Sequence, residues 1–456
     1  MVSMGAPHPF DVREDLASQG PFAISGTDAD MARALVGVLN GAGASAGLLD
    51  AMGSGARTIV LTEGLSGLPL TERHWQVLDQ CRMLHQRGAR IVLLQPAGAD
   101  DFGRLSGFAG LSRTLRQEWP GQQITTWSLP AAAPMDEKAT LILRALATGL
   151  QDADLTVDGA SVQQIAGAPR LNPSAPSTRN VWFAPGGARG VTSACVMELA
   201  RRQPGSVFVL AGRSGIAPWP AGIEVTTDTK QLRGALIAAA RASGQKPSLP
   251  DIDREARTLL AGQEIRATLD AITASGAQAV YLQADMSDRN SIVSAVDAII
   301  QQYGPITGLV HGAGVLADGL ALKKTREDVA HVFGPKVEGL AMLLDVLDPS
   351  RLRHVGLFSS ASAVFGNTGQ SDYAMANAWL GAVARKLAAD LPDAIVKSFC
   401  WGPWAGGMVD SSLAGHFAAR GISLIGLEDG ARIFADQILQ GDRSEVELLI
   451  GDEWAG

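Results

Sequence analysis

Short β-rich runs alternate with helical patterns along almost the whole chain, and this alternation restricts the fold more than any other feature. The first part has four such runs, at 21–24, 57–61, 89–94 and 123–129. The second part has seven, at 180–184, 206–211, 278–283, 306–311, 354–359, 395–401 and 445–450. Strands connected through helices run parallel, because each crossover returns the chain to the same edge of the sheet. The sequence therefore predicts an α/β protein with two Rossmann-like subdomains, each built on a doubly wound parallel sheet.

The two series are separated by a segment with the composition of a linker. Residues 154–170 predict a β-hairpin, since Asp158-Gly159 favours a type I′ turn between two alternating runs. The segment 172–178, which is rich in Pro and Ser, follows directly. We place the domain boundary at its end, which divides the chain into residues 1–178 and 179–456.

The first half lacks the glycine-rich turn of a nucleotide-binding fold. After its first run the chain reads Ile24-Ser-Gly26-Thr-Asp-Ala-Asp30, with one glycine and two acids where a phosphate would lie. The three tyrosines also all fall in the second half. We therefore expect the first half to bind no nucleotide and to be catalytically empty.

One long stretch interrupts the second half. Residues 214–262 separate the second run from the helix that should follow it, and a loop of that length needs structure of its own. Residues 230–242 and 252–275 carry helical spacing and good helix formers. We expect a helical insertion, which either pads the surface or serves an interface.

Composition and charge exclude several classes of protein. The chain is 46% hydrophobic with a net charge of −8 and has no polybasic block, so neither nucleic acid nor an anionic membrane surface is an expected partner. No apolar run approaches the roughly 18 residues of a membrane span, and residues 1–10 do not resemble a signal peptide. We expect a cytoplasmic protein. Its three cysteines are far apart and lack neighbouring histidines at ligand spacing, so we expect neither disulfides nor a metal site.

A glycine-rich turn follows the first run of the second half and opens an Ala- and Leu-rich helix. Glycines at such a turn allow the backbone to approach a pyrophosphate, and the helix N-terminus adds free N–H donors and a partial positive charge. The residues expected to hold a dinucleotide here are Gly186, Gly187, Ala188, Arg189, Gly190 and Val191.

Three more strand ends extend the predicted cofactor site. Arg213-Ser214 follows the second run, where an NAD-binding fold normally has an acid, and a cation there favours the 2′-phosphate of NADP. Asp285, followed by Met286, ends the third run and could accept a hydrogen bond from the adenine amino group; an ordinary helix N-cap region is the alternative. The fourth run leads into small residues that would admit the nicotinamide and its ribose: His311, Gly312, Ala313 and Gly314.

The strongest chemical signal combines a strand end, a helix start and a distant lysine. Ser360 lies 13 residues before Tyr373, Asn377 lies 4 residues after it, and Lys336 lies 37 residues upstream of the tyrosine. A tyrosine with a pKa near 10 is a poor acid at neutral pH unless a nearby cation stabilises its phenolate. Taken singly, such residues are solvated or packed in a core. Together, after a dinucleotide turn, they predict carbonyl reduction, with Ser360 hydrogen-bonded to the reacting oxygen.

These residues resemble the ketoreductase domain of a type I polyketide synthase, which is a complex short-chain dehydrogenase/reductase. Ordinary short-chain dehydrogenases carry Tyr-x-x-x-Lys, whereas here Asn377 takes the place of the lysine and Lys336 lies upstream, as in the synthase domains. The glycine turn departs from the family pattern at Pro185 and Thr192. Its Gly-Gly-Ala-Arg-Gly version and the long insertion are similar to ketoreductases of enediyne, polyunsaturated-fatty-acid and some trans-acyltransferase synthases.

The resemblance covers nearly the whole chain. Residues 1–178 resemble the truncated structural subdomain of the family, including 107–113 and 118–120. Residues 179–456 resemble its catalytic subdomain, in which the loop containing Gly402 and Pro403 covers the nicotinamide and 406–425 form the substrate lid.

The resemblance implies NADPH-dependent reduction of a 3-oxoacyl thioester, delivered on the phosphopantetheine arm of an acyl carrier protein among the other domains of a synthase. Tyr373 would donate the proton, Ser360 would orient the ketone, and Lys336 would lower the tyrosine pKa and hold the nicotinamide ribose. Asn377 would position that lysine and a relay water. The alternatives are a catalytically silent scaffold domain, against which the intact residues argue, and a freestanding dehydrogenase, which has no evident need for the first half.

The resemblance also implies a stereochemical outcome. In the family, a Leu-Asp-Asp element after the fourth strand accompanies a 3R (D) product, and a tryptophan eight residues before the tyrosine accompanies the L product. This chain keeps Leu316 and Asp318 and has Phe365 at the tryptophan position, which favours 3R. An ordinary exposed loop acid is the alternative for Asp318. Trp404 and Met408 complete the expected substrate and stereocontrol residues.

Overall fold

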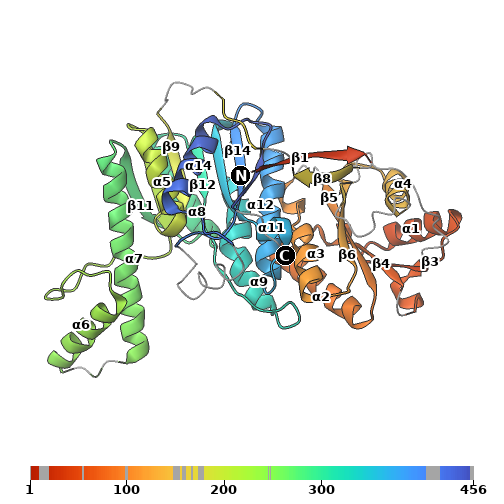
Figure 1. Ribbon diagram of the computed structural model, residues 1–456, viewed down its shortest axis with the longest axis horizontal. Helices are drawn as coiled ribbons and strands as arrows, with labels where there is room; N and C mark the ends of the chain where they lie inside the picture. Colours follow the sequence, from red (N-terminus) through yellow and green to blue (C-terminus); the bar gives the residue numbers. More distant parts are fainter. Residues whose placement is uncertain are drawn as a thin grey trace.

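The computed structural model describes residues 2–9, 20–53, 56–97, 101–146, 155–156, 161–165, 168–172, 179–244, 246, 248–406 and 422–451. A single 15-stranded sheet runs through these residues, with the strand order β11-β10-β9-β12-β13-β14-β15-β1-β8-β7-β6-β5-β4-β2-β3 (Figure 1). Each half of the chain contributes its own parallel series, and the two series meet at β1. The prediction of two parallel α/β subdomains is confirmed.

The second half holds seven parallel strands with helices on both faces. The strands are β9 (Val181–Pro185), β10 (Val207–Gly212), β11 (Gln278–Gln283), β12 (Gly308–His311), β13 (His354–Ser360), β14 (Ile395–Trp401) and β15 (Glu447–Ile450). One face packs on α5 (Gly190–Arg202), α7 (Leu249–Ala274) and α14 (Leu427–Gln440). The other packs on α8 (Arg289–Tyr303), α9 (Arg326–Phe333), α10 (Gly339–Val346) and α12 (Ser371–Asp390). All seven predicted strands are confirmed to within a few residues.

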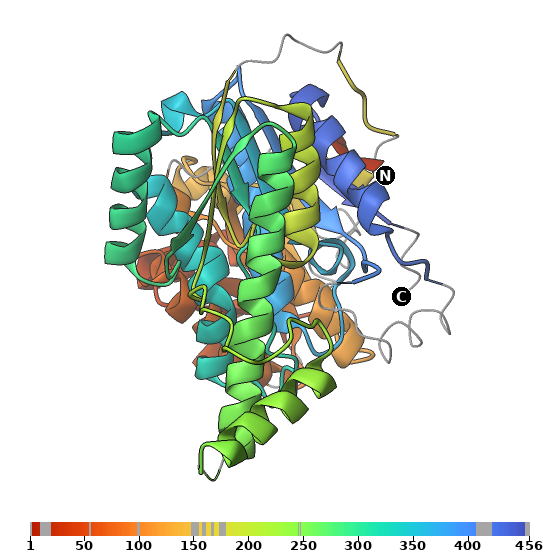
Figure 2. The ribbon, with the colours of Figure 1, turned by 90° about the vertical axis from the view of Figure 1, so that its left-hand side faces the viewer.

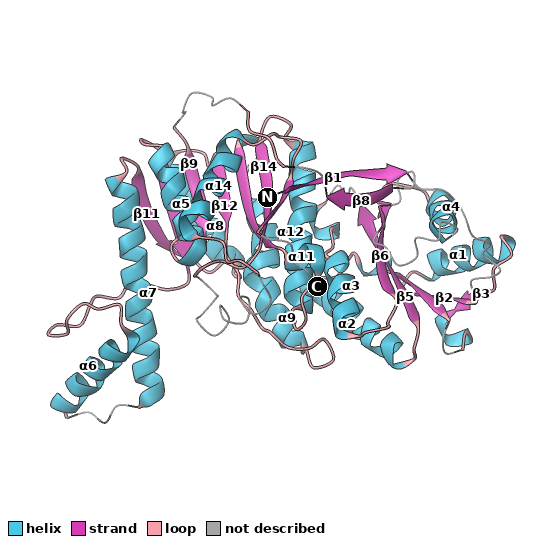
Figure 3. Cartoon of the chain, viewed as in Figure 1, coloured by secondary structure: helices cyan, strands magenta, loops and turns pink. Residues whose placement is uncertain are grey.

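The first half repeats this architecture on a smaller scale. Its parallel strands are β2 (Phe22–Gly26), β3 (Ala46–Leu48), β4 (Arg57–Leu61), β5 (Arg90–Ala97) and β6 (Ile124–Pro130). Helices α1 (Ala29–Gly41) and α4 (Met135–Leu146) cover one face, and α2 (Leu70–Gln86) and α3 (Phe108–Glu118) cover the other (Figure 3). The predicted hairpin is formed by β7 (Leu155–Thr156) and β8 (Ser161–Ile165), which pair antiparallel; its turn and most of the expected linker lie outside the described residues.

An N-terminal strand, which the sequence patterns did not indicate, joins the two series. β1 (Val2–Pro9) pairs antiparallel with β15 of the second half and with β8 of the first half. Its sequence contains Gly5, Pro7 and Pro9, which are poor strand formers. The strand forms because two sheet edges offer unpaired N–H and C=O groups on either side of it.

The two halves also share a hydrophobic core, in which α3 packs tightly against α12. A Cβ atom at Gly107 would lie 1.8 Å from the carbonyl oxygen of Met375, and one at Gly110 would lie 2.2 Å from that of Ala374. Only glycine allows this approach of the two backbones. Helix α12 carries the catalytic tyrosine predicted above, so the first half supports the element on which the expected chemistry depends.

A fragment that begins near Arg179 is expected to aggregate. Removal of α2 and α3 would expose the core that they share with α12, and removal of β1 would expose one edge of β15. We propose residues 1–178 and 179–456 as the two subdomains on this basis. Size-exclusion chromatography of the fragment beside the full chain checks the expectation, and a monodisperse 179–456 fragment with the full chain's activity would contradict it.

The expected helical insertion is confirmed and projects from the body of the protein (Figures 1 and 2). Helix α6 (Thr229–Ala242) and the N-terminal part of α7 form an arm with a small core of its own, made of Leu232, Leu236, Ile252, Ala256 and Leu259. The C-terminal part of α7 is the crossover helix between β10 and β11. One helix therefore serves both the arm and the sheet.

The remaining expectations concern cysteines, metals and membranes. Cys81, Cys195 and Cys400 are all free and buried. Within the ranges given above, no cluster of three potential metal ligands is found. None of the described helices has the length and apolar character needed to cross a bilayer.

Candidate active site

A cleft lies at the carboxyl ends of β9, β10, β11 and β12, where parallel sheets bind ligands. The space between these strand ends, open solvent included, is about 760 Å³. Gly186 and Gly190 have φ values of +78° and +63°, which favour glycine. A Cβ at Gly186 would lie 2.6 Å from the backbone of Gly312 and Ala313, so the two turns are in contact. Of the expected cofactor residues, those lining the cleft are Gly186, Ala188, Arg189, Arg213, Ser214, Asp285, Met286, Ala313 and Gly314.

The start of α5 is already occupied by a carboxylate from α7. Glu264 accepts a hydrogen bond from the backbone N–H of Gly190 at 2.8 Å and forms an ion pair with Arg189 at 2.7 Å. This amide belongs to the helix N-terminus expected to hold a pyrophosphate. The sequence reasoning missed Glu264, because its distance along the chain gives no sign of this contact. A bound pyrophosphate would share these donors with the glutamate or displace it.

The outer end of the cleft carries the residues expected at the adenosine. Arg213 is exposed and makes no ion pair with any described residue, so its guanidinium can meet an anion from solvent. The Tyr281 hydroxyl donates to the Ser214 carbonyl at 2.6 Å, which holds the loop after β10. Asp285 accepts from the backbone N–H of Ser287 through one oxygen at 2.8 Å, as an N-cap-type contact would, and still lines the cleft. Both interpretations of Asp285 are therefore compatible with its position.

Lys336 is buried in a π-helical turn, η5 (Gly334–Glu338), beside the inner end of the cleft. Its Nζ donates to the carbonyl of Phe358 at 2.8 Å and lies 5.3 Å from the centre of the Tyr373 ring. Burial lowers the pKa of Lys336 to about 7. A Cβ at Gly314 would lie 3.1 Å from the lysine Cε, so glycine allows the loop after β12 to cover this side chain. The turn therefore holds the lysine amine with little solvent around it, and this amine loses its proton more readily than that of an exposed lysine.

His311 holds the same turn from β12. Its Nε2 lies 3.0 Å from the backbone carbonyl of Lys336, and its Nδ1 is buried without a partner among the described residues. Burial and the nearby lysine lower the pKa of His311 to about 3, so the ring is neutral at physiological pH. Only a neutral ring can donate from one nitrogen and accept at the other.

The predicted catalytic residues come together between β13 and α12. Burial raises the pKa of Tyr373, the polar side chains of Asn377 and Ser360 oppose this rise, and the charge of Asp318 adds to it. Asn377 is fully buried, and its Nδ2 donates to the backbone carbonyl of Tyr373 at 2.8 Å. The Asn377 Oδ1 has no partner in the described structure. The Nζ of Lys336 lies over the ring of Tyr373.

A buried ion pair, which the sequence reasoning missed, holds the start of α12. The Nζ of Lys324 lies 2.7 Å from Asp372, and both side chains are at most 1% exposed. Asp372 also accepts from the backbone N–H of Tyr373 at 2.8 Å, while Lys324 donates to the carbonyl of Ala317. Burial raises the pKa of Asp372 to about 6. The adjacent Asp-Tyr at a helix start was the available signal, but its lysine partner is distant in sequence.

The other predicted residues come from the loops and helices around these groups. Asp318 is exposed and accepts from Gln370 at 3.2 Å, and Phe365 ends α11 (Ser362–Phe365), where it is half-buried. Trp404 is buried, and its ring fills the space beside Gly430 of α14. Val191, Gly187, Gly402, Pro403 and Leu316 do not line the described cleft. Met408 and residues 407–421 of the expected lid lie outside the described residues.

The fold and these side chains are those of a short-chain dehydrogenase/reductase: a parallel sheet, a glycine turn after its first strand, and Ser, Tyr, Asn and Lys at the carboxyl edge. Residues 185–406 match the family described as the KR domain. The chain belongs to the ketoreductase domains of type I polyketide synthases.

Relatives and solved structures agree with that family. The chain is 35% identical over 386 residues to a polyunsaturated fatty acid synthase protein from Thraustochytrium sp., which fits the expected subtype; the match covers 80% of this chain and 13% of that protein. It is 34% identical over 165 residues to polyketide synthase PksL from Bacillus subtilis, covering 35% and 4%. The chain thus spans a small part of these relatives.

The structural likeness extends over both halves. A ketoreductase domain from the bacillaene assembly line has a TM-score of 0.69 at 20% identity and covers 99% of this chain and 96% of its own. A structure described as A-type ketoreductases from a modular polyketide synthase has a TM-score of 0.73 at 18% identity, covering 99% and 92%. At these identities the likeness shows the fold.

Proposed function

We propose that this chain reduces a 3-oxoacyl thioester to a 3-hydroxyacyl thioester with NADPH. The observation that carries the proposal is the meeting of Tyr373, Ser360, Asn377 and Lys336 beside a cleft with a dinucleotide turn. The turn at Gly186 lies directly against the backbone of Gly312 and Ala313, which fits a bound dinucleotide. The unpartnered Oδ1 of Asn377 fits an ordered polar group beside it. NADPH, when bound, supplies the hydride that reduces the ketone carbon.

The cofactor is held, in this proposal, by groups along the cleft. Arg213 meets the 2′-phosphate, the amides of the turn at Gly186 meet the pyrophosphate, and Asp285 accepts from the adenine. Lys336 reaches a hydroxyl of the nicotinamide ribose. The small residues after β12 leave room for the nicotinamide itself.

The proton comes from Tyr373. Burial raises its pKa, so the phenol keeps its proton until the ketone oxygen gains negative charge. Ser360 donates to that oxygen and orients the carbonyl. The ammonium of Lys336 then stabilises the phenolate left behind, and Asn377 uses its free Oδ1 to hold a relay water.

The substrate is carried, in this proposal, on the phosphopantetheine arm of an acyl carrier protein within a larger synthase. The family of the chain and the multidomain synthases to which it is similar support this partner. Other synthase domains would supply the 3-oxoacyl chain by carbon–carbon bond formation and use the hydroxyl product.

Incubation with a short 3-oxoacyl thioester and NADPH tests the function. We expect the reduced nicotinamide to be consumed and one hydroxyacyl thioester to form for each NADPH used. A folded protein that binds NADPH but reduces neither the thioester nor its carrier-bound form would refute the proposal. That outcome would favour the silent scaffold domain.

Cofactor preference is expected to follow Arg213. Its guanidinium can bind the 2′-phosphate with two hydrogen bonds, and NADH offers it no such group. We expect kcat/KM to be at least about tenfold higher with NADPH than with NADH. Arg213→Ala should remove most of that preference, whereas Arg241→Ala, on the projecting helix α6, should keep it. Equal kcat/KM for both cofactors in the unaltered protein would exclude this role.

The product is expected to be the 3R hydroxyacyl thioester. Entry of the pantetheine arm from either side of the cleft decides which ketone face meets the nicotinamide, and a difference of about 2.7 kcal/mol gives roughly a hundredfold preference. Leu316, Asp318 and Phe365 favour the 3R side by their resemblance to the family. Chiral chromatography of the reduced thioester checks this, and a mainly 3S product would overturn it.

A further inference from the structure

A second pocket lies in the first half, and it shares no lining residue with the cofactor cleft. Thr62 follows β4, Pro96 lies near the end of β5, and Ala131 follows β6. These three parallel strands are neighbours, so the pocket opens at the carboxyl edge of the sheet. Open α/β sheets bind their ligands at this edge.

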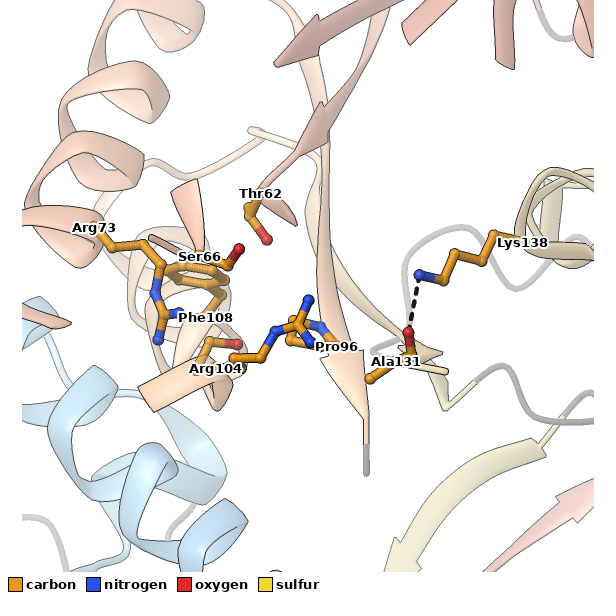
Figure 4. Close-up of a pocket in the computed structure, with 9 residues that line it drawn as sticks. Thr62, Ser66, Arg73, Pro96, Arg104, Phe108, Ala131 and Lys138 are labelled. Atoms are coloured by element: carbon orange, nitrogen blue, oxygen red, sulfur yellow. Dashed lines mark hydrogen bonds between the residues drawn. The ribbon is translucent and has the colours of Figure 1, made fainter. Parts of the chain in front are cut away.

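Three cations from three different elements line this pocket. Arg73 comes from α2, Arg104 from the short helix η4 (Phe102–Arg104), and Lys138 from α4. In Figure 4 the Arg104 side chain extends across the pocket between the other two. No acidic residue is among the described residues that line it. The pocket therefore has a strongly positive lining.

Arg73 is the least expected of the three because it is buried, with 2% exposure. Its two terminal nitrogens donate to the backbone carbonyls of Gly103, at 2.9 Å, and Leu105. Its Nε is buried without a partner in the described structure, and no described carboxylate lies within ion-pair distance. Burial lowers the pKa of Arg73 to about 10, so the side chain remains a cation at neutral pH. The charges of Glu338 and Asp101 oppose this lowering without forming an ion pair with Arg73. Burial of the cation is costly, and an anion beside it would offset that cost.

The other groups suit an oxyanion. Arg104 is exposed and makes no hydrogen bond or ion pair with a described residue, so its fork of donors is available. Lys138 is 7% exposed and donates to the carbonyl of Ala131 at 3.2 Å (Figure 4). The hydroxyl of Ser66 adds a neutral donor at the same pocket. Arginine forks match the geometry of phosphate oxygens.

We propose that this pocket binds a phosphate group carried by a small molecule, independently of the cofactor. The pocket is smaller than the cofactor cleft, which favours a single phosphate group over a dinucleotide. The first half also has no glycine turn after β2 that could hold the pyrophosphate of a dinucleotide. The pocket thus lies where doubly wound sheets bind their ligands, but we expect it to hold a small phosphate in place of a dinucleotide.

Isothermal titration calorimetry of the full chain with inorganic phosphate and with glycerol 3-phosphate tests the proposal. Arg104→Gln is the test variant, because this side chain is exposed and makes no hydrogen bond or ion pair with a described residue. Arg90→Gln is its matched control: Arg90 is also exposed and begins β5, at the opposite edge of the same sheet. We expect Arg104→Gln to weaken binding at least about tenfold, as the loss of a charged hydrogen bond does, and Arg90→Gln to leave it unchanged.

The outcomes distinguish binding in this pocket from binding in the cofactor cleft. They also distinguish an organic phosphate from free inorganic phosphate as the ligand. Tighter binding of glycerol 3-phosphate would identify an organic phosphate as the ligand, and equal binding would identify free phosphate. NADPH affinity should be the same in both variants, since neither residue lines the cofactor cleft. Absence of binding to the unaltered protein, or equal binding by Arg104→Gln and Arg90→Gln, would overturn the proposal.

Discussion

Tyr373→Phe is expected to lower kcat by about 10²- to 10⁴-fold, the usual contribution of a positioned general acid. The substitution removes the phenolic proton and leaves the ring beside Lys336, whose Nζ lies 5.3 Å from the ring centre. Because the hydroxyl lies outside the pyrophosphate and adenosine parts of the cleft, NADPH affinity should change little. Steady-state kinetics with the thioester and fluorescence titration with NADPH measure the two effects.

Tyr303→Phe provides the matched control for this experiment. It makes the same chemical change at the end of α8, away from the cleft, and should leave kcat unaltered. A Tyr373→Phe variant that kept most of its kcat would show that the tyrosine has a packing role, and the mechanism would be wrong. Loss of activity in both variants would instead point to a general effect of losing a hydroxyl.

Lys336→Met is expected to lower kcat by about 10- to 100-fold, as the loss of a charged hydrogen-bond donor does. The pH at which kcat responds to ionisation of Tyr373 should rise, because the cation that stabilises the phenolate is gone. Lys386→Met, farther along α12 and paired with Asp390, should change neither quantity. A pH–rate profile of Lys336→Met identical to that of the unaltered protein would show that the lysine does not tune the tyrosine.

The same variant has a second, independent readout in stability. Burial lowers the pKa of Lys336 from the ordinary value of about 10.4 to about 7, so the unfolded chain binds more protons than the folded one between these two values. The free energy of unfolding of the cofactor-free protein should therefore rise with pH across this window, relative to Lys336→Met. Denaturant unfolding of both proteins at pH 7 and 9 measures the difference, and a difference that does not vary with pH would contradict the lowered pKa.

The relation between the two halves gives these predictions their structural context. The first half has no expected catalytic residue, yet Gly107 at the N-cap of α3 and Gly110 within α3 lie against the backbone of α12 one or two residues beyond Tyr373. Glu118 of the first half also accepts hydrogen bonds from the backbone N–H groups of Ala321 and Gly369. Two loops that precede the tyrosine in the chain are thus held by a subdomain that carries none of the expected catalytic groups.

Much of the fold and of the site can be predicted from local sequence patterns. The inner parallel strands are buried on both faces and read as apolar runs, as Val207–Gly212 does. The turn at Gly186 and Gly190 needs positive φ values that only glycine adopts readily. These are properties of a few neighbouring residues. The spacing of Ser360, Tyr373 and Asn377 is equally local, because it spans one strand end and one helix start.

Contacts between distant segments could not be predicted in this way. Strand β1 has a poor strand sequence and forms because the edges of β8 and β15 lie beside it. Glu264 meets Gly190, Lys324 meets Asp372, and Arg73 meets Gly103 only after the elements that carry them have packed together. The sequence alone thus determined which elements form and which chemical groups they carry, because propensity and periodicity act over short distances. The tertiary structure decided which of those groups meet, which become buried and how their pKa values shift, because burial and charge proximity depend on residues far apart in the chain.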